Sequence, residues 1–166
     1  ARLAAKAESA HHPVKIVNAG SSGETTAGGL RRLNWLLRQQ VTIMVVCLGG
    51  NDGLRGVAVD STKENLRQLI RQARKQQPEI IVVLAGMQVP SSMGPEYTTA
   101  FKAIYPALAE EEKVPLIPFL LEGVGGLKDY NQADGIHPNA AGHLLIAATV
   151  WQTLEPILRK LPETTP

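Results

Sequence analysis

Residues 42–49 are "TIMVVCLG" and residues 80–86 are "IIVVLAG". Both runs are almost wholly apolar and rich in β-branched residues, a pattern typical of strands that are covered on both faces. Residues 14–18 ("VKIVN") and 114–119 ("VPLIPF") are further strand candidates. Because helical patterns separate these runs, the sequence predicts an α/β domain with a largely parallel sheet.

Segments with helical periodicity alternate with the strand candidates. Ser61 and Glu64 match a capping box at the start of one of them, and Pro156 is expected to bend the last. The first ten residues are good helix formers, although no cap or strand precedes them. The helices are therefore predicted at residues 1–10, 30–40, 61–76, 97–112 and 139 to about 161.

Length and composition favour one globular domain over residues 1–166, with 44% hydrophobic and 19% charged residues. The net charge of +2 is scattered along the chain, which gives no reason to expect nucleic acid as a partner. No run approaches the ~18 apolar residues of a membrane span. Cys47, the single cysteine, is expected in the core. Basic side chains are expected on solvated helix faces, namely Arg31, Arg32, Arg38, Lys63, Arg67, Arg71 and Arg74.

Residues 18–29, "NAGSSGETTAGG", follow a strand candidate, where open α/β sheets place their sites. The loop lacks the lysine of a P-loop and the spacing of a dinucleotide motif, which leaves phosphate or nucleotide binding through residues 19–29 as a weak alternative. A tight turn with a Ser or Thr helix cap explains the composition equally simply. A further interpretation is that one glycine N–H donates to developing negative charge.

Two more polar stretches follow at later points of the chain. In "GGNDG" (49–53), Asn51 carries an amide that can donate to an oxyanion, although such a sequence is more often only a turn. In "DGIHPN" (134–139), Asp134 can orient His137 as a general base. The simpler interpretation is a helix entry with Pro138 at the first helical position. No metal site is expected, because no His, Cys or carboxylate cluster completes one.

The motifs "NAGSSGETT", "GGNDG" and "DGIHPN", in this order, resemble the SGNH (GDSL-type) hydrolase family. The runs "GGNDGLRG" and "AIYPALAEEEKVPLIPF" are similar to the branch of acyl-CoA thioesterase I, lysophospholipase L1 and arylesterase. The resemblance implies a flavodoxin-like three-layer α/β/α sandwich with strand order 2-1-3-4-5. It also implies that Gly23 and Asn51 form the oxyanion hole and that Asp134 and His137 belong to a Ser-Asp-His triad. Glu24 stands where that branch often has Asp.

The Gly-Asp-Ser-Leu-like motif that carries the family's serine is not in this sequence. The expectation is therefore that the nucleophile and the first, central strand belong to a segment before Ala1. A truncated chain whose gap is filled by a partner or a swapped strand is the alternative. Without the central strand, the unpaired backbone groups would cost about 1–3 kcal/mol each.

The resemblance implies an esterase that acts on short to medium aryl or alkyl esters, lysophospholipids or acyl thioesters, without cofactor or metal. Relatives of this branch are often periplasmic or secreted, and the sequence itself gives no compartment. Met87, Val89 and Pro90, in a loop after a strand, are expected to line the acyl pocket, although a plain surface loop explains them as well. The competing function is a scaffold without nucleophile that only binds acyl or glycan ligands.

Overall fold

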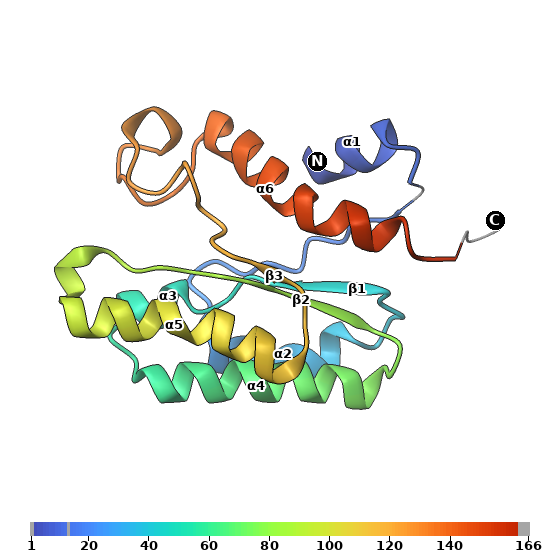
Figure 1. The fold of residues 1–166 in the computed structure, drawn as a ribbon, viewed down its shortest axis with the longest axis horizontal. Helices are drawn as coiled ribbons and strands as arrows, with labels where there is room; N and C mark the ends of the chain where they lie inside the picture. Colours follow the sequence, from blue (N-terminus) through green and yellow to red (C-terminus); the bar gives the residue numbers. More distant parts are fainter. Residues whose placement is uncertain (1, 13, 163–166) are drawn as a thin grey trace. The chain divides into compact units, whose positions relative to one another are not determined.

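The structure is a computed structural model that describes residues 2–12 and 14–162. The chain forms two compact units (Figure 1). The first holds the residues up to Asn18 together with those from Leu120 onward, and the second is the continuous segment Ala19–Phe119.

The second unit is built on a parallel sheet of order β1-β2-β3, formed by β1 (Ile43–Val46), β2 (Ile81–Ala85) and β3 (Leu116–Ile117). Ile43 lies opposite Ile81, and Leu84 lies opposite Leu116. The predicted α/β class with a parallel sheet is confirmed. The third strand is shorter than predicted, because Pro115 and Pro118 flank it and lack the N–H that a ladder needs.

One helix of the second unit precedes β1, and the others carry the chain from each strand to the next. They are α2 (Thr26–Leu36), α3 (Gly50–Leu54), α4 (Val59–Gln76), the 3-10 turn η1 (Ser91–Met93) and α5 (Pro95–Glu112). Figure 1 shows α2, α4 and α5 on one face of the sheet. The core between them contains Leu33, Leu66, Ile70, Leu84, Phe101 and Leu108. Each such side chain contributes about 1.5–3 kcal/mol through burial.

The predicted strand at residues 14–18 is wrong. None of these residues belongs to a strand, and the side chains of Val14, Ile16 and Val17 are exposed. A strand forms only beside another strand that accepts its hydrogen bonds. In the described part of the chain β1 pairs with β2 alone, so this apolar run has no ladder to join.

Two predictions about single side chains are also wrong. The helix predicted to start at a capping box begins one turn earlier, with Ala58 as its N-cap, so Ser61 lies inside α4. Cys47 is exposed and not part of the core. It directly follows Val46, which points into the core beneath the helices, and successive side chains of an extended chain point to opposite faces.

The first unit contains α1 (Arg2–Ser9), the 3-10 turn η2 (Lys128–Tyr130) and α6 (Ala140–Leu158). The helix α1 packs against α6, where the His12 and Trp151 rings lie 6.2 Å apart, and α6 also contacts η2. Helices predicted at both ends of the chain are therefore confirmed, with α6 ending before Leu161. Pro156 lies inside α6, and the bend there stays a prediction.

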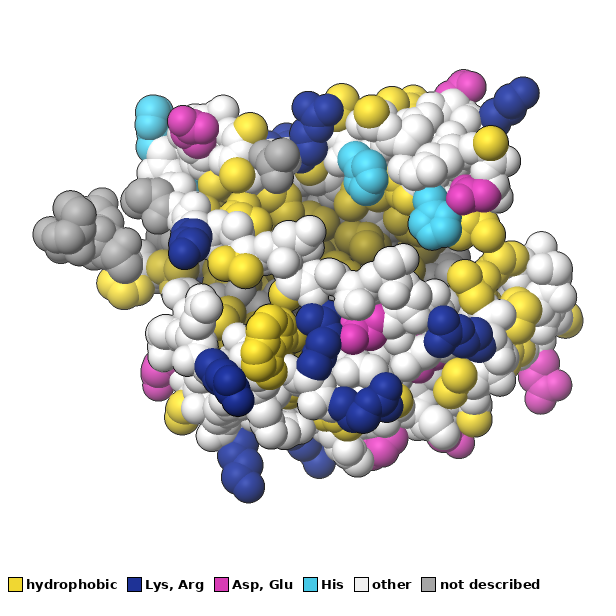
Figure 2. All heavy atoms as spheres, turned by 180° about the vertical axis from the view of Figure 1, so that it is seen from behind, with side chains coloured by type: hydrophobic (Ala, Val, Ile, Leu, Met, Phe, Trp, Pro, Cys, Tyr) yellow, Lys and Arg dark blue, Asp and Glu magenta, His cyan; other side chains and the backbone are white. Residues whose placement is uncertain are grey.

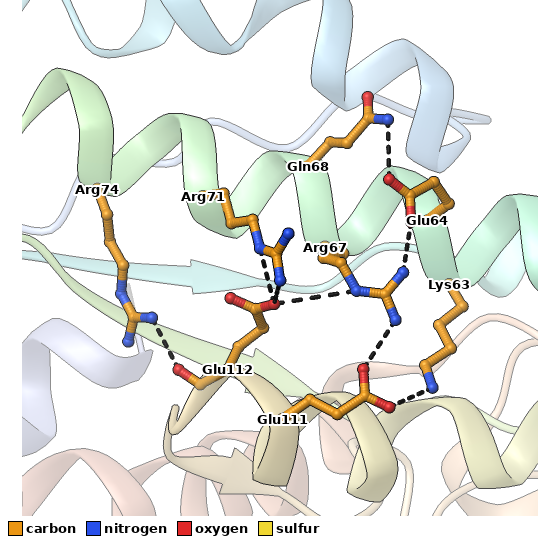
Figure 3. Close-up of polar contacts among 8 residues, drawn as sticks. All are labelled: Lys63, Glu64, Arg67, Gln68, Arg71, Arg74, Glu111 and Glu112. Atoms are coloured by element: carbon orange, nitrogen blue, oxygen red, sulfur yellow. Dashed lines mark hydrogen bonds and ion pairs between the residues drawn. The ribbon is translucent and has the colours of Figure 1, made fainter.

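An ion-pair network joins α4 to α5 (Figure 3). Glu112, whose side chain is 7% exposed, accepts from Nε of Arg71 at 2.9 Å and from its Nη2 at 2.8 Å. Its backbone oxygen accepts from Arg74 at 2.7 Å. Glu111 is more exposed and pairs with Lys63 and Arg67. Four basic residues of α4, Lys63, Arg67, Arg71 and Arg74, therefore bond residues of α5, although they were predicted to form a solvated face.

Other basic side chains are dispersed. On the face drawn in Figure 2, Lys and Arg side chains are dispersed among neutral and acidic side chains. Arg32 was predicted on a solvated face, but it is only partly exposed because it pairs with Glu24. Among the described residues, every helix is too short or too polar to cross a bilayer.

The network predicts that Glu112→Gln lowers the free energy of unfolding by about 1–3 kcal/mol, because charge-assisted bonds to a nearly buried carboxylate are lost. The matched control is Glu111→Gln, one position earlier, whose carboxylate is 43% exposed and screened by water. Urea denaturation of both variants measures the difference. An equal or larger loss for Glu111→Gln would contradict the assignment of Glu112 as the principal residue of the network.

Candidate active site

The side chains of Asp134 and His137 are joined directly. Oδ2 of Asp134 lies 2.7 Å from Nδ1 of His137, and Oδ1 accepts from the backbone N–H groups of Ile136 and His137, both at 2.9 Å. Gly135 has φ +69°, which lets the chain fold back so that a carboxylate can reach a ring three residues later. The predicted local unit of Asp134 and His137 is thus present within the first unit of the fold.

Hydrogen bonding sets the protonation of this pair. The backbone N–H groups of His137 and Ile136, followed by the His137 side chain, lower the pKa of Asp134 from 3.8 to about 2. Because the ionised Asp134 carboxylate only accepts, a neutral His137 ring bonded to it carries its hydrogen on Nδ1 and has its lone pair on Nε2. The His137 side chain is 68% exposed, so this lone pair is accessible. This contact favours one tautomer of the ring and leaves its second nitrogen open to solvent.

Two asparagines anchor the loop that carries the pair. Asn131 is buried, and its amide donates to the backbone oxygens of Val124 at 2.5 Å and Leu127 at 2.8 Å. Asn131 also forms an antiparallel bridge with Pro138, which closes the loop. Asn139 caps α6, accepting from the second and third N–H groups of that helix. Pro138 therefore precedes the cap. The simpler interpretation, which placed Pro138 at the first helical position, is wrong in this detail.

The glycine-rich loop of the second unit lies against α3. Gly23 has φ +71°, and no acceptor among the described residues takes its N–H. Its carbonyl accepts from Nη2 of Arg55 at 3.0 Å. Asn51, in the first turn of α3, donates from Nδ2 to the Glu24 carbonyl at 3.0 Å. The structure thus places the Asn51 side chain against the loop that contains Gly23.

The turn before Asn51 has no room for a side chain. Gly49 has φ +109°, and a Cβ there would lie 2.1 Å from the Tyr105 hydroxyl. That hydroxyl donates to the Leu48 carbonyl at 3.1 Å, which fixes the end of the strand and the start of α3. A glycine is therefore required where the chain turns from β1 towards Asn51.

Asp52 and Arg32 also bond residues of this loop. The carboxylate of Asp52 is buried and accepts from the Thr26 N–H at 2.8 Å and from the Thr26 hydroxyl at 2.5 Å. Arg32 pairs with Glu24 and donates to the Ala19 carbonyl at 2.6 Å. The side chain of Glu24, at the position where the branch often has Asp, thus belongs to an ion pair. Sequence patterns did not indicate Asp52, Arg32, Arg55 or Asn131, because their partners are distant backbone groups or carboxylates.

Met87 and Val89 pack on α3, the helix that carries Asn51. A Cβ on Gly50 would lie 3.0 Å from the Met87 methyl group, and one on Gly53 would lie 2.2 Å from Cγ1 of Val89. Pro90 is exposed and precedes η1. Within the described chain, no group of three or more His, Cys, Asp or Glu side chains is arranged to hold a metal ion. No hydrogen bond joins His137 to a serine hydroxyl in the same residues.

A family model with the description GDSL-like lipase/acylhydrolase matches residues 1–145, most of the chain. The chain belongs to the GDSL-like lipase/acylhydrolase family. It is 46% identical over 145 residues to the esterase TesA of Pseudomonas aeruginosa, covering 87% of this chain and 71% of the relative. It is 42% identical over 144 residues to thioesterase 1/protease 1/lysophospholipase L1 of Escherichia coli, covering 86% and 68%.

Solved structures agree with the family. A crystal structure of the psychrotrophic esterase EstA from Pseudoalteromonas sp., inhibited by monoethylphosphonate, matches with a TM-score of 0.87 at 30% identity, covering 95% of this chain and 86% of that one. The predicted SGNH (GDSL-type) family, its thioesterase, lysophospholipase and arylesterase branch, and the flavodoxin-like fold are thereby confirmed. As a member of this GDSL-like family, the protein is a hydrolase of carboxylic esters.

The hydrogen bonds to Asp134 predict that it stays ionised far into the acid range. Because its folded-state pKa of about 2 lies below 3.8, the carboxylate stabilises the fold above pH 3.8, and this contribution is lost as the pH falls towards 2. A carboxyl ¹³C NMR titration should give an inflection near pH 2 for Asp134. In His137→Ala the inflection should stay below 3.8, because the two backbone donors remain. An inflection at 3.8 in the wild type would contradict this assignment.

Proposed function

We propose that this family member hydrolyses acyl esters with a Ser-Asp-His triad, in which His137 is the general base and Asp134 its orienting carboxylate. The observation that carries the proposal is the 2.7 Å contact between Nδ1 of His137 and Oδ2 of Asp134. It leaves Nε2 free to take a proton from a hydroxyl nucleophile. The carboxylate then stabilises the imidazolium that results.

The proposed reaction has two halves. A serine hydroxyl gives its proton to Nε2 of His137 and attacks the acyl carbonyl, and the imidazolium then protonates the departing alcohol or thiol. In the second half, His137 removes a proton from water, which attacks the acyl-enzyme, and the imidazolium then returns that proton to the serine oxygen as the acid is released. Since His137 serves as base and then acid in both halves, its loss should affect acylation and deacylation alike.

Gly23 and Asn51 are proposed as oxyanion donors to the same acyl group. The Gly23 N–H has no acceptor among the described residues, so it is available. An amide nitrogen carries two hydrogens, and Nδ2 of Asn51 uses one on the Glu24 carbonyl. The second hydrogen, held in a fixed direction by the first bond, can donate to the oxyanion. Such preorganised donors act without reorganisation cost during the reaction.

The serine itself is proposed to lie outside residues 1–166. The support is the absence of a Gly-Asp-Ser-Leu-like motif from the sequence, together with a match that covers 71% of one curated relative and 68% of another. We also propose that both units belong to a single hydrolase domain, because the family model matches residues from each of them.

The proposed substrates are aryl or alkyl esters of short to medium acyl chains, lysophospholipids and acyl thioesters. Relatives named as an esterase and as a thioesterase and lysophospholipase support this class. Met87, Val89 and Pro90 are proposed to line the acyl pocket, because two of them pack directly on the helix that carries Asn51.

His137→Ala should lower kcat in the full-length protein by about four to six orders of magnitude, as removal of a triad base does elsewhere. The matched control is His143→Ala, an exposed histidine on α6 that should keep wild-type turnover. Hydrolysis of p-nitrophenyl butanoate and labelling by a fluorophosphonate measure both variants. Near-normal turnover of His137→Ala would refute the role of that residue. A full-length wild type that is not labelled would instead indicate a binding scaffold without nucleophile.

Asn51→Ala should lower kcat by about 100- to 1000-fold with little change in KM, because its donor acts in the transition state. The comparison is Asn34→Ala, an exposed asparagine on α2 whose side-chain oxygen accepts from Gln72. Steady-state kinetics on the same ester distinguishes the two. A loss confined to KM in Asn51→Ala would show that Asn51 binds substrate without stabilising the oxyanion.

Shortening Met87 should change selectivity more than turnover. If the residue lines the acyl pocket, Met87→Ala should raise kcat/KM for long acyl chains relative to short ones. The ratio should change by about tenfold for each extra methylene of the substrate that occupies the space left by the Met87 side chain. A series of p-nitrophenyl esters from acetate to decanoate measures the shift. An unchanged chain-length profile would exclude Met87 from the pocket.

A further inference from the structure

The short helix α3 and its C-cap hold the segment Gly23–Thr26, which carries the proposed donor Gly23. Three side chains of α3 and its C-cap bind three of the four residues of the segment Gly23–Thr26. Asn51 donates to the Glu24 carbonyl, Asp52 accepts from Thr26, and Arg55 donates to the Gly23 carbonyl. Because Asn51 and Arg55 are four residues apart, they project from the same side of the turn.

We infer that Arg55 is a positioning residue for the oxyanion hole, an inference that rests on the proposed role of Gly23 as a donor. Nη2 of Arg55 donates to the Gly23 carbonyl at 3.0 Å. A Cβ built on Gly23 would lie 3.7 Å from the same nitrogen, so the guanidinium lies directly beside this residue. Arg55 is the C-cap of α3, and its own N–H bonds the Asn51 and Asp52 carbonyls, which fixes the start of its side chain.

The Gly23 carbonyl and the Glu24 N–H belong to one planar peptide, and that N–H bonds the Ser21 carbonyl at 3.4 Å, which closes a turn around the peptide that carries the Gly23 N–H. A glycine at φ +71° has no side chain to restrain it, and its peptide groups can rotate at small cost. The charge-assisted bond from Arg55 and the Asn51 bond hold the two peptides that follow Gly23, and the turn bond to Ser21 extends this restraint to the peptide that carries the Gly23 N–H. Both proposed donors are thereby held to one another. A displacement of about 1 Å at a reacting centre can cost about 100-fold in rate.

Arg55 differs from Asp52 in what its removal leaves behind. Asp52 is buried, so its loss would strand the Thr26 donors inside the second unit and destabilise the fold. Arg55 and Gly23 are both exposed, so water can replace the guanidinium at the carbonyl. Loss of Arg55 should therefore change the precision of the loop and leave the folded structure intact.

The test uses the full-length active protein and the variants Arg55→Ala, Arg55→Lys and Arg55→Gln. Arg38→Ala is the matched control, because Arg38 is exposed and its side chain bonds no other described residue. With p-nitrophenyl butanoate, a neutral ester, Arg55→Ala should lose about 10- to 100-fold in kcat with little change in KM. Arg55→Lys, which keeps a cationic donor, should recover part of this loss, and Arg55→Gln less.

A second readout distinguishes positioning from general destabilisation. The rate of covalent modification by a fluorophosphonate should fall by the same factor as kcat/KM, because the phosphonyl oxygen occupies the oxyanion hole. The thermal midpoint of Arg55→Ala should match that of Arg38→Ala. Parallel losses in hydrolysis and phosphonylation at an unchanged midpoint would support the inference.

Several results would overturn it. Turnover of Arg55→Ala equal to that of Arg38→Ala would show that the loop needs no such restraint. A rise in KM at constant kcat would make Arg55 a substrate-binding residue. If Asn51→Ala is impaired while Arg55→Ala is not, the proposed function stands and only this inference fails. A full-length wild type without esterase activity or labelling would instead overturn the proposed function itself.

Discussion

The carboxylate of Asp134 is the centre on which the proposed chemistry depends. It accepts two backbone N–H groups and one imidazole N–H, and these bonds lower its pKa to about 2. The same bonds that close the turn at Gly135 therefore keep the charge in place at every pH at which His137 could act as a base. The bonds that form the turn also hold the Asp134 carboxylate beside the His137 ring, so the same contacts determine the local structure and the charge next to the imidazole.

In the second unit, similar side-chain bonds hold the loop that carries the proposed oxyanion donors. Side chains of α3 and its C-cap bond backbone groups of the segment from Gly23 to Thr26. The helix can begin where it does because Gly49 accepts a left-handed conformation against Tyr105. The loop is thus held by neighbouring polar side chains and not by extensive secondary structure, which suits the role that we propose for its N–H groups.

The sequence predicted the elements whose pattern is local. The apolar runs at β1 and β2, the stripes of α4 and α5, and the Asp134–His137 spacing depend on residues close together in the chain. Predictions failed where the outcome depends on a distant partner. Residues 14–18 have strand composition but no neighbouring strand in the described chain, and the arginines of α4 are paired by glutamates from α5. Arg55 and Asn131 escaped notice for the same reason, since their acceptors are backbone carbonyls that no motif marks.

The measurement that tests the central claim most directly is the tautomer of His137 in solution. In ¹⁵N-histidine-labelled protein at a pH where the ring is neutral, long-range ¹H–¹⁵N correlation spectra distinguish protonated from unprotonated ring nitrogens. The account predicts that Nδ1 carries the hydrogen, bonded to Asp134, and that Nε2 is unprotonated. In Asp134→Ala this preference should be lost. A wild-type ring with the hydrogen on Nε2 would contradict the assignment of His137 as the base.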